Sequence, residues 1–233
     1  MARIIGSPSR YIQGKGTLAE ITKYTERLGK KLLILVSKSG KKRVEEKINK
    51  AVEGTDTTVV WEIFNGECSK SEVNRIGENL KKEKCDIVVG IGGGKILDTA
   101  KAVAYYEDIA VVCVPTAAST DAPCSALSVL YTDDGQFDEY LWLPANPDII
   151  LLDTDIIVAA PVRLIVSGMG DALATYFETR ACMRSNTTSC MGGSVSKTAM
   201  ALSELCFKTL MEDGAKALLA VNAGACTPAV ENI

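Results

Sequence analysis

Residues 87–106 read IVVGIGGGKILDTAKAVAYY. A β-branched apolar run at 87–91 leads into three consecutive glycines at 92–94, and residues 96–106 follow with a helical pattern. A strand, a glycine turn and a helix form the setting in which backbone amides bind phosphate, because glycine lets a ligand approach the backbone closely. The stretch therefore predicts a phosphate-binding turn, and the alternative is a tight strand–helix turn that binds nothing.

Two charged side chains follow the glycines. Lys95 comes directly after them and can add positive charge for a pyrophosphate. Asp98 lies one turn into the helix, where it either interacts favourably with the helix dipole or accepts a hydrogen bond from a cofactor or substrate. The run fits neither the GxGxxG pattern nor the GxxxxGK pattern, so the exact mode of phosphate binding stays open.

Four further apolar runs flank this unit and alternate with helical patterns. Continuous β-branched runs suit strands that are covered on both faces, which is typical of a parallel sheet. Strands that alternate with helices predict right-handed βαβ crossovers. We therefore expect an α/β fold with a parallel sheet, whose other strands lie at residues 32–36, 57–64, 109–114 and 149–152.

The pattern changes twice along the chain. Around residues 128–143, two apolar stretches flank Asp133-Asp134-Gly135, a turn signal that predicts an added β-hairpin. After about residue 160 strand signals vanish and amphipathic helical patterns take over. We expect a dinucleotide-binding domain at residues 1–160, followed at residues 161–233 by the first part of an all-helical domain.

Two helix starts carry local signals. Ser69 precedes a helical pattern and has Glu72 three residues on, as in a capping box. Thr227 and Pro228 give a second start, with threonine as the cap and proline at the first helical position. The sequence ends at Ile233, too soon for a stable helix, so we expect a longer protein that has been cut.

Composition excludes several classes of partner. The 233-residue chain carries 26 basic and 29 acidic residues, a net charge of −3, and only 6% aromatic residues. These values predict neither a basic face nor a stacking surface for nucleic acid. The N-terminal stretch lacks a signal-peptide core, and no apolar run approaches the roughly 18 residues that span a bilayer. We expect a cytoplasmic protein without a membrane partner.

The counts of cysteine and histidine limit the chemistry. None of the eight cysteines forms a CxxC pair, so we expect reduced, small apolar side chains rather than a thiolate metal site. The sequence contains no histidine. It therefore lacks the commonest metal ligand and the usual acid–base group near neutral pH.

A second polar constellation, PTAASTDAPCSALSVLY, occupies residues 115–131. It follows the strand expected at 109–114, and ligands of open α/β sheets bind at the carboxyl ends of strands. Asp121 can accept a hydrogen bond from a substrate hydroxyl. A polar, turn-rich loop without a ligand is the alternative. The hydroxyl groups in this stretch belong to Thr116, Ser119, Thr120 and Ser125.

Asp171 is a lone carboxylate in the helical part of the chain. It follows Gly168-Met169-Gly170, where a helix is expected to begin. A single carboxylate at that position is more often a partner of the helix dipole than a metal ligand. Without histidine, no residue in the sequence completes a metal site around it.

At these residues the sequence resembles the metal-dependent, iron-containing-type alcohol dehydrogenase family, and within it the glycerol dehydrogenase branch. The resemblance covers residues 3 to about 182 without large gaps. Lys95 after the glycines, where the wider family usually has serine, and the stretch STDAPCSALSV are specific to that branch. The matching stretches are RIIGSPSRYIQG, FNGECS, GIGGGKILDTAKAVA, PTAASTDAPCSALSVLYTDDGQFDEY and SGMGDALATYFETRAC.

The resemblance implies a function that the residues alone do not establish. It implies reversible, NAD- and zinc-dependent oxidation of glycerol to dihydroxyacetone, in a cleft between a Rossmann-like and a helical domain of a homo-oligomeric enzyme. Asp121 is implied as the catalytic, substrate-contacting residue, and Asp171 as one of three zinc ligands, the other two being histidines further along. The implied NAD contacts are Gly94, Lys95, Asp98, Thr116, Ser119, Ser125, Leu127 and Tyr131.

Two departures from the family pattern matter. Ser37 stands at the end of the LLILV strand, where the family often has an acidic residue for the adenosine ribose, and this weakens the preference for NAD over NADP. The missing histidines predict that the chain by itself is inactive. The alternatives are a non-catalytic dinucleotide-binding remnant and a related dehydroquinate synthase or glycerol-1-phosphate dehydrogenase. The second of these is disfavoured because the 115–131 loop contains no cation.

Overall fold

The computed structural model describes residues 2–233, and they divide into two compact units. The sheet unit consists of Pro8–Thr116 and Ala122–Ile157. The helical unit consists of the N-terminal residues up to Ser7, the segment Ala117–Asp121, and Val158–Ile233. The loop after the strand expected at 109–114 therefore contributes residues to both units.

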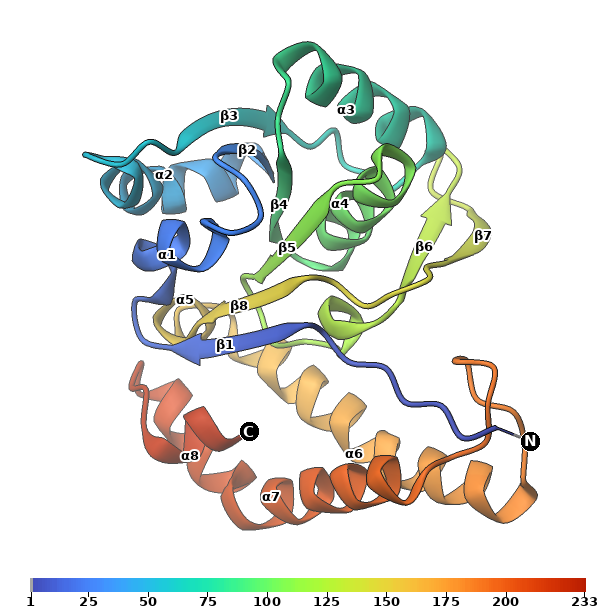
Figure 1. Ribbon diagram of the computed structural model, residues 1–233. Helices are drawn as coiled ribbons and strands as arrows, with labels where there is room; N and C mark the ends of the chain where they lie inside the picture. Colours follow the sequence, from blue (N-terminus) through green and yellow to red (C-terminus); the bar gives the residue numbers. More distant parts are fainter. Residues whose placement is uncertain (1) are drawn as a thin grey trace. The chain divides into compact units, whose positions relative to one another are not determined.

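A parallel six-stranded sheet forms the centre of the sheet unit, as the alternating pattern predicts (Figure 1). The strand order is β1-β8-β5-β4-β2-β3, and every neighbouring pair is parallel. The edge strand β1 is absent from the sequence-based expectation because its short sequence RYIQG is mostly exposed and lacks an apolar run. The strands are β1 (Arg10–Gly14), β2 (Lys31–Val36), β3 (Thr58–Ile63), β4 (Ile87–Gly92), β5 (Ala110–Pro115) and β8 (Ile149–Asp153).

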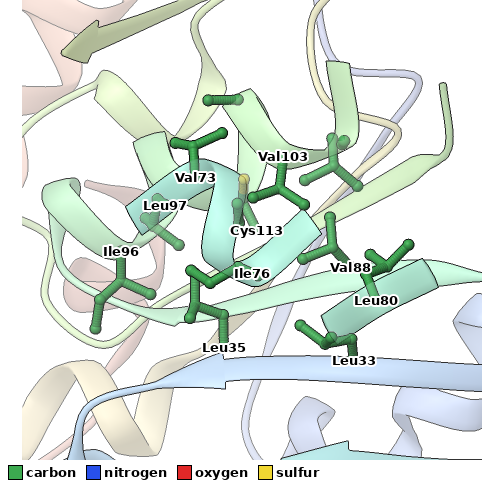
Figure 2. Close-up of a cluster of buried hydrophobic side chains, with 14 of the residues drawn as sticks. Leu33, Leu35, Val73, Ile76, Leu80, Val88, Ile96, Leu97, Val103 and Cys113 are labelled. Carbon is green, nitrogen blue, oxygen red and sulfur yellow. The ribbon is translucent and has the colours of Figure 1, made fainter. Parts of the chain in front are cut away.

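Helices cover both faces of this sheet, so its central strands β2, β4 and β5 are almost entirely apolar. On β2, Leu33 and Leu35 point into one core, and the intervening residues Leu32 and Ile34 point into the other. Helices α3 (Lys70–Glu83) and α4 (Gly94–Glu107) close the first core, where Ile76 and Leu97 belong to the same cluster of buried side chains as the β2 leucines (Figure 2). The second core is closed by η1 (Thr17–Glu20), α1 (Ile21–Thr25) and α2 (Lys38–Val52).

The predicted hairpin is present in the sheet unit. Strands β6 (Leu127–Tyr131) and β7 (Phe137–Trp142) pair antiparallel, after the short helix η2 (Ala122–Cys124). Gly135 closes the turn with a φ of 85°, a conformation that glycine adopts without strain. The register shifts between Leu130 and Tyr131, so Tyr131 pairs with Phe137.

Of the two hydrogen bonds in the capping box predicted at Ser69, the structure contains one. The Ser69 hydroxyl accepts a hydrogen bond from the Glu72 amide at the start of α3. The Glu72 carboxylate does not return to Ser69, because it accepts instead from Asn65 and Arg75. Burial pulls the pKa of Glu72 upward, but Arg75 and the Asn65 amide together hold it below its ordinary value.

The helical unit begins with a helix that is longer than the sequence pattern predicts. Helix α6 (Val162–Ser185) starts nine residues before Asp171, so the helix start expected at Asp171 is wrong. Gly168 and Gly170 lie inside this helix rather than before it. A β-carbon on Gly168 would meet the Ala118 carbonyl oxygen at 2.2 Å, so this glycine permits close packing rather than a helix start.

Two further helices complete this unit. Helix α7 (Lys197–Asn222) packs on α6, with the rings of Tyr176 and Phe207 5.0 Å apart. Helix α8 (Pro228–Asn232) has proline in its first turn, as expected, but the Thr227 side chain makes no capping bond. Helix α5 (Thr154–Val158) follows β8 directly, and all of it except Val158 belongs to the sheet unit.

Two expectations from the sequence concern the cysteines and membrane-spanning helices. All eight cysteines are free thiols, and Cys68, Cys85 and Cys113 are buried. Within residues 2–233, no helix is long and apolar enough to cross a membrane.

Candidate functional site

The glycine turn joins β4 to α4, and its three glycines have different structural roles. A β-carbon on Gly92 would lie 2.5 Å from Ile96 Cδ1, so this glycine allows the helix to fold back on the strand. Gly93 and Gly94 have no neighbouring atom within 4 Å of such a carbon. None of the three glycines has a positive φ, so backbone conformation does not require glycine at any of them. Close packing requires it at Gly92, and open space surrounds Gly93 and Gly94. The first residues of α4 therefore present bare backbone.

The N-terminus of α4 has the features of an anion-binding helix start. No side chain caps it at Gly93, and its first turn contains no acidic residue. The first N–H groups of a helix have no partner within the helix, and the helix dipole places positive potential there. Thr116 donates its amide to the Gly92 carbonyl over 3.0 Å, which brings the end of β5 to this turn. Gly94 and Thr116 thus belong to one locality.

Lys95 contacts Glu67 and Tyr131, and the sequence pattern predicted neither contact. Its Nζ atom lies 2.6 Å from Glu67 Oε2 and 5.4 Å from the centroid of the Tyr131 ring. The Tyr131 amide donates to the Cys68 carbonyl over 2.8 Å, so the hairpin is fixed beside the segment that carries Glu67. Glu67 neutralises the lysine in this arrangement. The stretch FNGECS contains Glu67, but nothing in its spacing points to Lys95.

Asp98 is buried, although it was expected to interact with the helix dipole or with a ligand. It lies beyond the first turn of α4 and is 7% exposed. Its Oδ2 atom accepts from the Val129 amide over 3.2 Å, and its backbone carbonyl accepts from the Ser128 hydroxyl over 2.9 Å. Its Oδ1 atom lies 2.9 Å from Lys101 Nζ as an ion pair, without a hydrogen bond. Asp98 therefore ties α4 to β6.

Ser125 and Leu127 lie on the segment between η2 and β6. The Ser125 hydroxyl donates to the Ala122 carbonyl over 3.0 Å, which makes a compact turn. The Leu127 carbonyl accepts a hydrogen bond from Lys101. Sequence reasoning missed Lys101, whose only signal is a lysine inside the apolar stretch ILDTAKAVA.

Ser119, Asp121 and Asp171 belong to the helical unit and form a second locality. The Asp121 amide donates to Asp171 Oδ2 over 2.9 Å. The Ser119 carbonyl accepts from the Ser167 hydroxyl over 3.2 Å, one turn earlier on α6. Asp171 is exposed, and its carboxylate is oriented by the backbone of the 117–121 segment. The structure thus brings Asp121 and Asp171 together.

The donor set around Asp171 does not complete a metal site within this chain. Zinc sites use three or four protein ligands drawn from Cys, His, Asp and Glu. Among residues 2–233, no three such residues lie close enough together to hold a metal ion. The chain also contains no histidine. Asp171 and the other residues present therefore do not fit a catalytic zinc.

Ser37, at the end of β2, has a structural role. Its hydroxyl accepts from the Gly40 amide over 3.0 Å and caps α2. The hydroxyl is thus engaged within the chain.

The fold and these localities define a class of protein. Residues 8–154, more than half of the chain, match the family model of iron-containing alcohol dehydrogenases, and the chain belongs to this family. The expectation drawn from the glycine turn and the 115–131 loop is thereby confirmed at the level of the family.

The individual relatives are longer than this chain. It is 46% identical, over all of its length, to a glycerol dehydrogenase from Escherichia coli, and it spans 64% of that protein. It is 40% identical to a glycolaldehyde reductase from Halobacterium salinarum, again over 64% of the relative. The glycerol dehydrogenase structure from Schizosaccharomyces pombe superposes on 99% of this chain with a TM-score of 0.93 at 37% identity, and this chain covers 59% of it.

Proposed function

We propose that this chain binds a nicotinamide dinucleotide at the N-terminus of α4. The observation that carries the proposal is the bare backbone at Gly93 and Gly94, which face open space at an uncapped helix start. Backbone N–H groups at such a start carry partial positive charge and suit the oxygens of a pyrophosphate. A diphosphate bound here would meet backbone at Gly93 and Gly94, where an added β-carbon would have no atom within 4 Å.

The remaining cofactor contacts are proposed on either side of this turn. Thr116 lies beside Gly92, and the Lys95 ammonium group lies over the Tyr131 ring, so both residues adjoin the same helix start. Lys95 would exchange Glu67 for a phosphate oxygen, since its side chain is 54% exposed and sits on a flexible four-carbon stem. The full set of proposed NAD contacts is Gly94, Lys95, Asp98, Thr116, Ser119, Ser125, Leu127 and Tyr131.

We infer that the whole protein oxidises glycerol, or a closely related diol, reversibly to the hydroxyketone with NAD⁺ as the hydride acceptor. The glycerol dehydrogenase relatives support glycerol, and the glycolaldehyde reductase relative supports the wider class of small substrates with adjacent oxygen-bearing carbons. Asp121 would accept a hydrogen bond from a substrate hydroxyl. We assign cofactor binding and the Asp121 contact to the domain at 1–160, and metal binding and the remaining substrate contacts to the domain at 161–233.

The 233-residue chain is proposed to lack zinc-dependent activity by itself. Asp171 would serve as one metal ligand, but a single exposed carboxylate holds zinc poorly when three protein ligands are needed. This same observation favours a second candidate function, a dinucleotide-binding protein without catalysis. Zinc-dependent oxidation of glycerol by the purified chain would contradict the proposal, and a rate equal to the protein-free control would support it.

The binding proposal is tested by titrating NADH into the purified chain and following nicotinamide fluorescence. We expect saturable enhancement that ADP-ribose reverses, because ADP-ribose carries the same diphosphate without the nicotinamide. A parallel titration with NADPH measures what Ser37 does to the preference between the two cofactors. An NADH signal that stays linear to millimolar concentration would overturn the proposal.

A further inference from the structure

Lys101 is a buried cation that the proposed chemistry does not use. It lies in the middle of α4, two turns after the glycine turn, and the residue is 1% exposed. Lysine is almost never fully buried unless it is paired, because an isolated ammonium group is costly to remove from water. Its contacts therefore account for its presence in the apolar interior.

The contacts of Lys101 converge on one segment of chain. Its Nζ atom donates to the Ala122 carbonyl over 2.9 Å and to the Leu127 carbonyl. It also lies 3.3 Å from the Ser125 hydroxyl. One ammonium group thus contacts three residues of the six-residue segment 122–127. Asp98, on the same helix, supplies the compensating negative charge, with its Oδ1 atom 2.9 Å from Lys101 Nζ.

The geometry of this group determines how the segment lies on the helix. Residues 122–127 contain only the short helix η2 before β6 begins at Leu127. The Ser125 hydroxyl closes a turn on the Ala122 carbonyl, and Asn146 donates to the Cys124 carbonyl over 2.8 Å, but neither bond reaches α4. Helix α4 and strand β6 lie side by side (Figure 1). Lys101 joins the start of the segment, at Ala122, to its end, at Leu127, and Asp98 joins the helix to Val129 just beyond.

We propose that Lys101 is the positioning residue of the nucleotide-binding segment 122–127. It holds Ser125 and Leu127, two proposed NAD contacts, in a fixed place relative to the glycine turn at the head of the same helix. This inference rests on the proposed function. Because preorganised binding groups lose less conformational entropy when a ligand binds, removal of the ammonium group weakens cofactor binding without any loss of direct contact.

The test compares Lys101→Met with a matched control, Lys47→Met, in the 233-residue chain. Lys47 pairs at 3.4 Å with the buried carboxylate of Asp153, so its loss also leaves a buried acid without its cation, away from the 122–127 segment. Two quantities are measured for each variant: the NADH dissociation constant by fluorescence, and the hydrogen-exchange rates of the amides in residues 122–129 by mass spectrometry.

We expect Lys101→Met to weaken NADH binding at least tenfold and to accelerate exchange in residues 122–129, while peptides from β2 keep their protection. The NADH dissociation constant of Lys47→Met should stay within about twofold of that of the unaltered chain. This should hold even if the two variants lose equally in melting temperature. Unchanged affinity in Lys101→Met, or an equal loss in both variants, would overturn the inference. Failure of the unaltered chain to bind NADH would instead overturn the proposed function.

If Lys101→Met does not fold, Lys101→Arg provides the test. Arginine keeps a cation beside Asp98, but its donors lie in a planar fork. It therefore cannot donate to the carbonyls of both Ala122 and Leu127 in the way that the lysine ammonium group does. At least threefold weaker NADH binding, with faster exchange in residues 122–129, is the expected result. Unaltered affinity and exchange would overturn the role of Lys101.

Discussion

Gly90, inside strand β4, and Gly94, at the start of α4, should respond in opposite ways to an added methyl group. A β-carbon on Gly90 would lie 2.8 Å from the Ala100 β-carbon, and 3.4 Å from both the Ile96 carbonyl oxygen and Leu97 Cδ2. Gly94, at the first position of α4, has nothing within 4 Å of its added carbon. Gly90→Ala should therefore damage the fold, and Gly94→Ala should damage only the binding of NADH.

The magnitudes follow from these contacts. Overpacking of a well-packed core costs about 1–3 kcal/mol, and in a domain of this size 1 kcal/mol changes the melting temperature by about 2–4 °C. Gly90→Ala should thus lower the melting temperature by about 2–12 °C. Gly94→Ala should leave stability unchanged or raise it by up to about 1 kcal/mol, because alanine restricts the unfolded chain and no positive φ forbids it.

Binding and stability are measured on the same two preparations. Differential scanning calorimetry gives the melting temperature, and NADH fluorescence gives the dissociation constant. We expect Gly94→Ala to bind NADH at least tenfold more weakly than the unaltered chain, a loss of about 1.4 kcal/mol. A Gly94→Ala chain that binds NADH with unaltered affinity would refute the role assigned to the bare backbone.

Three further predictions concern the sheet unit and its thiols. Ser69→Ala should destabilise the chain by about 1 kcal/mol in urea unfolding, because the amide of Glu72 loses its capping acceptor. The pKa of Glu72 is depressed in the folded chain, so its stabilising effect is complete above the unfolded value of about 4.3 and is lost as the pH falls further. The cost of Glu72→Gln, about 1–3 kcal/mol near pH 7, should therefore shrink towards pH 3, and a cost that is constant with pH would contradict this account. Burial raises the pKa of Cys68 and of Cys113 to about 12, so at pH 8 iodoacetamide should modify the exposed Cys190 and spare both, as peptide mass spectrometry would show.

The apolar strands and the glycine turn could be predicted because each rests on a local pattern. Residues 32–36 and 87–91 read as continuous apolar runs, and both are central strands covered on two faces. The turn at Asp133-Asp134-Gly135 likewise indicated the hairpin. Edge strand β1 carries no such run, because one side of it meets solvent, and its pairing with β8 depends on residues about 140 positions away.

The candidate site was less accessible to sequence reasoning, since its contacts join distant segments. The pairing of Lys95 with Glu67 and the bond from Asp121 to Asp171 link residues 28 and 50 positions apart. The helix start was predicted at Asp171, directly after Gly168-Met169-Gly170, whereas both glycines lie within α6, where Gly168 leaves room for the Ala118 carbonyl. Lys101 escaped notice because a lysine in a helical pattern is usually solvated.

The most direct test of dinucleotide binding at the head of α4 is the amide spectrum of the isotope-labelled chain during titration with NAD⁺. We predict saturable chemical-shift changes concentrated at residues 93–98, at Thr116 and along 122–131, with the amides of α2 and β3 unmoved. Shifts confined to other elements, or no shifts at millimolar NAD⁺, would contradict the assignment of this turn as the cofactor site.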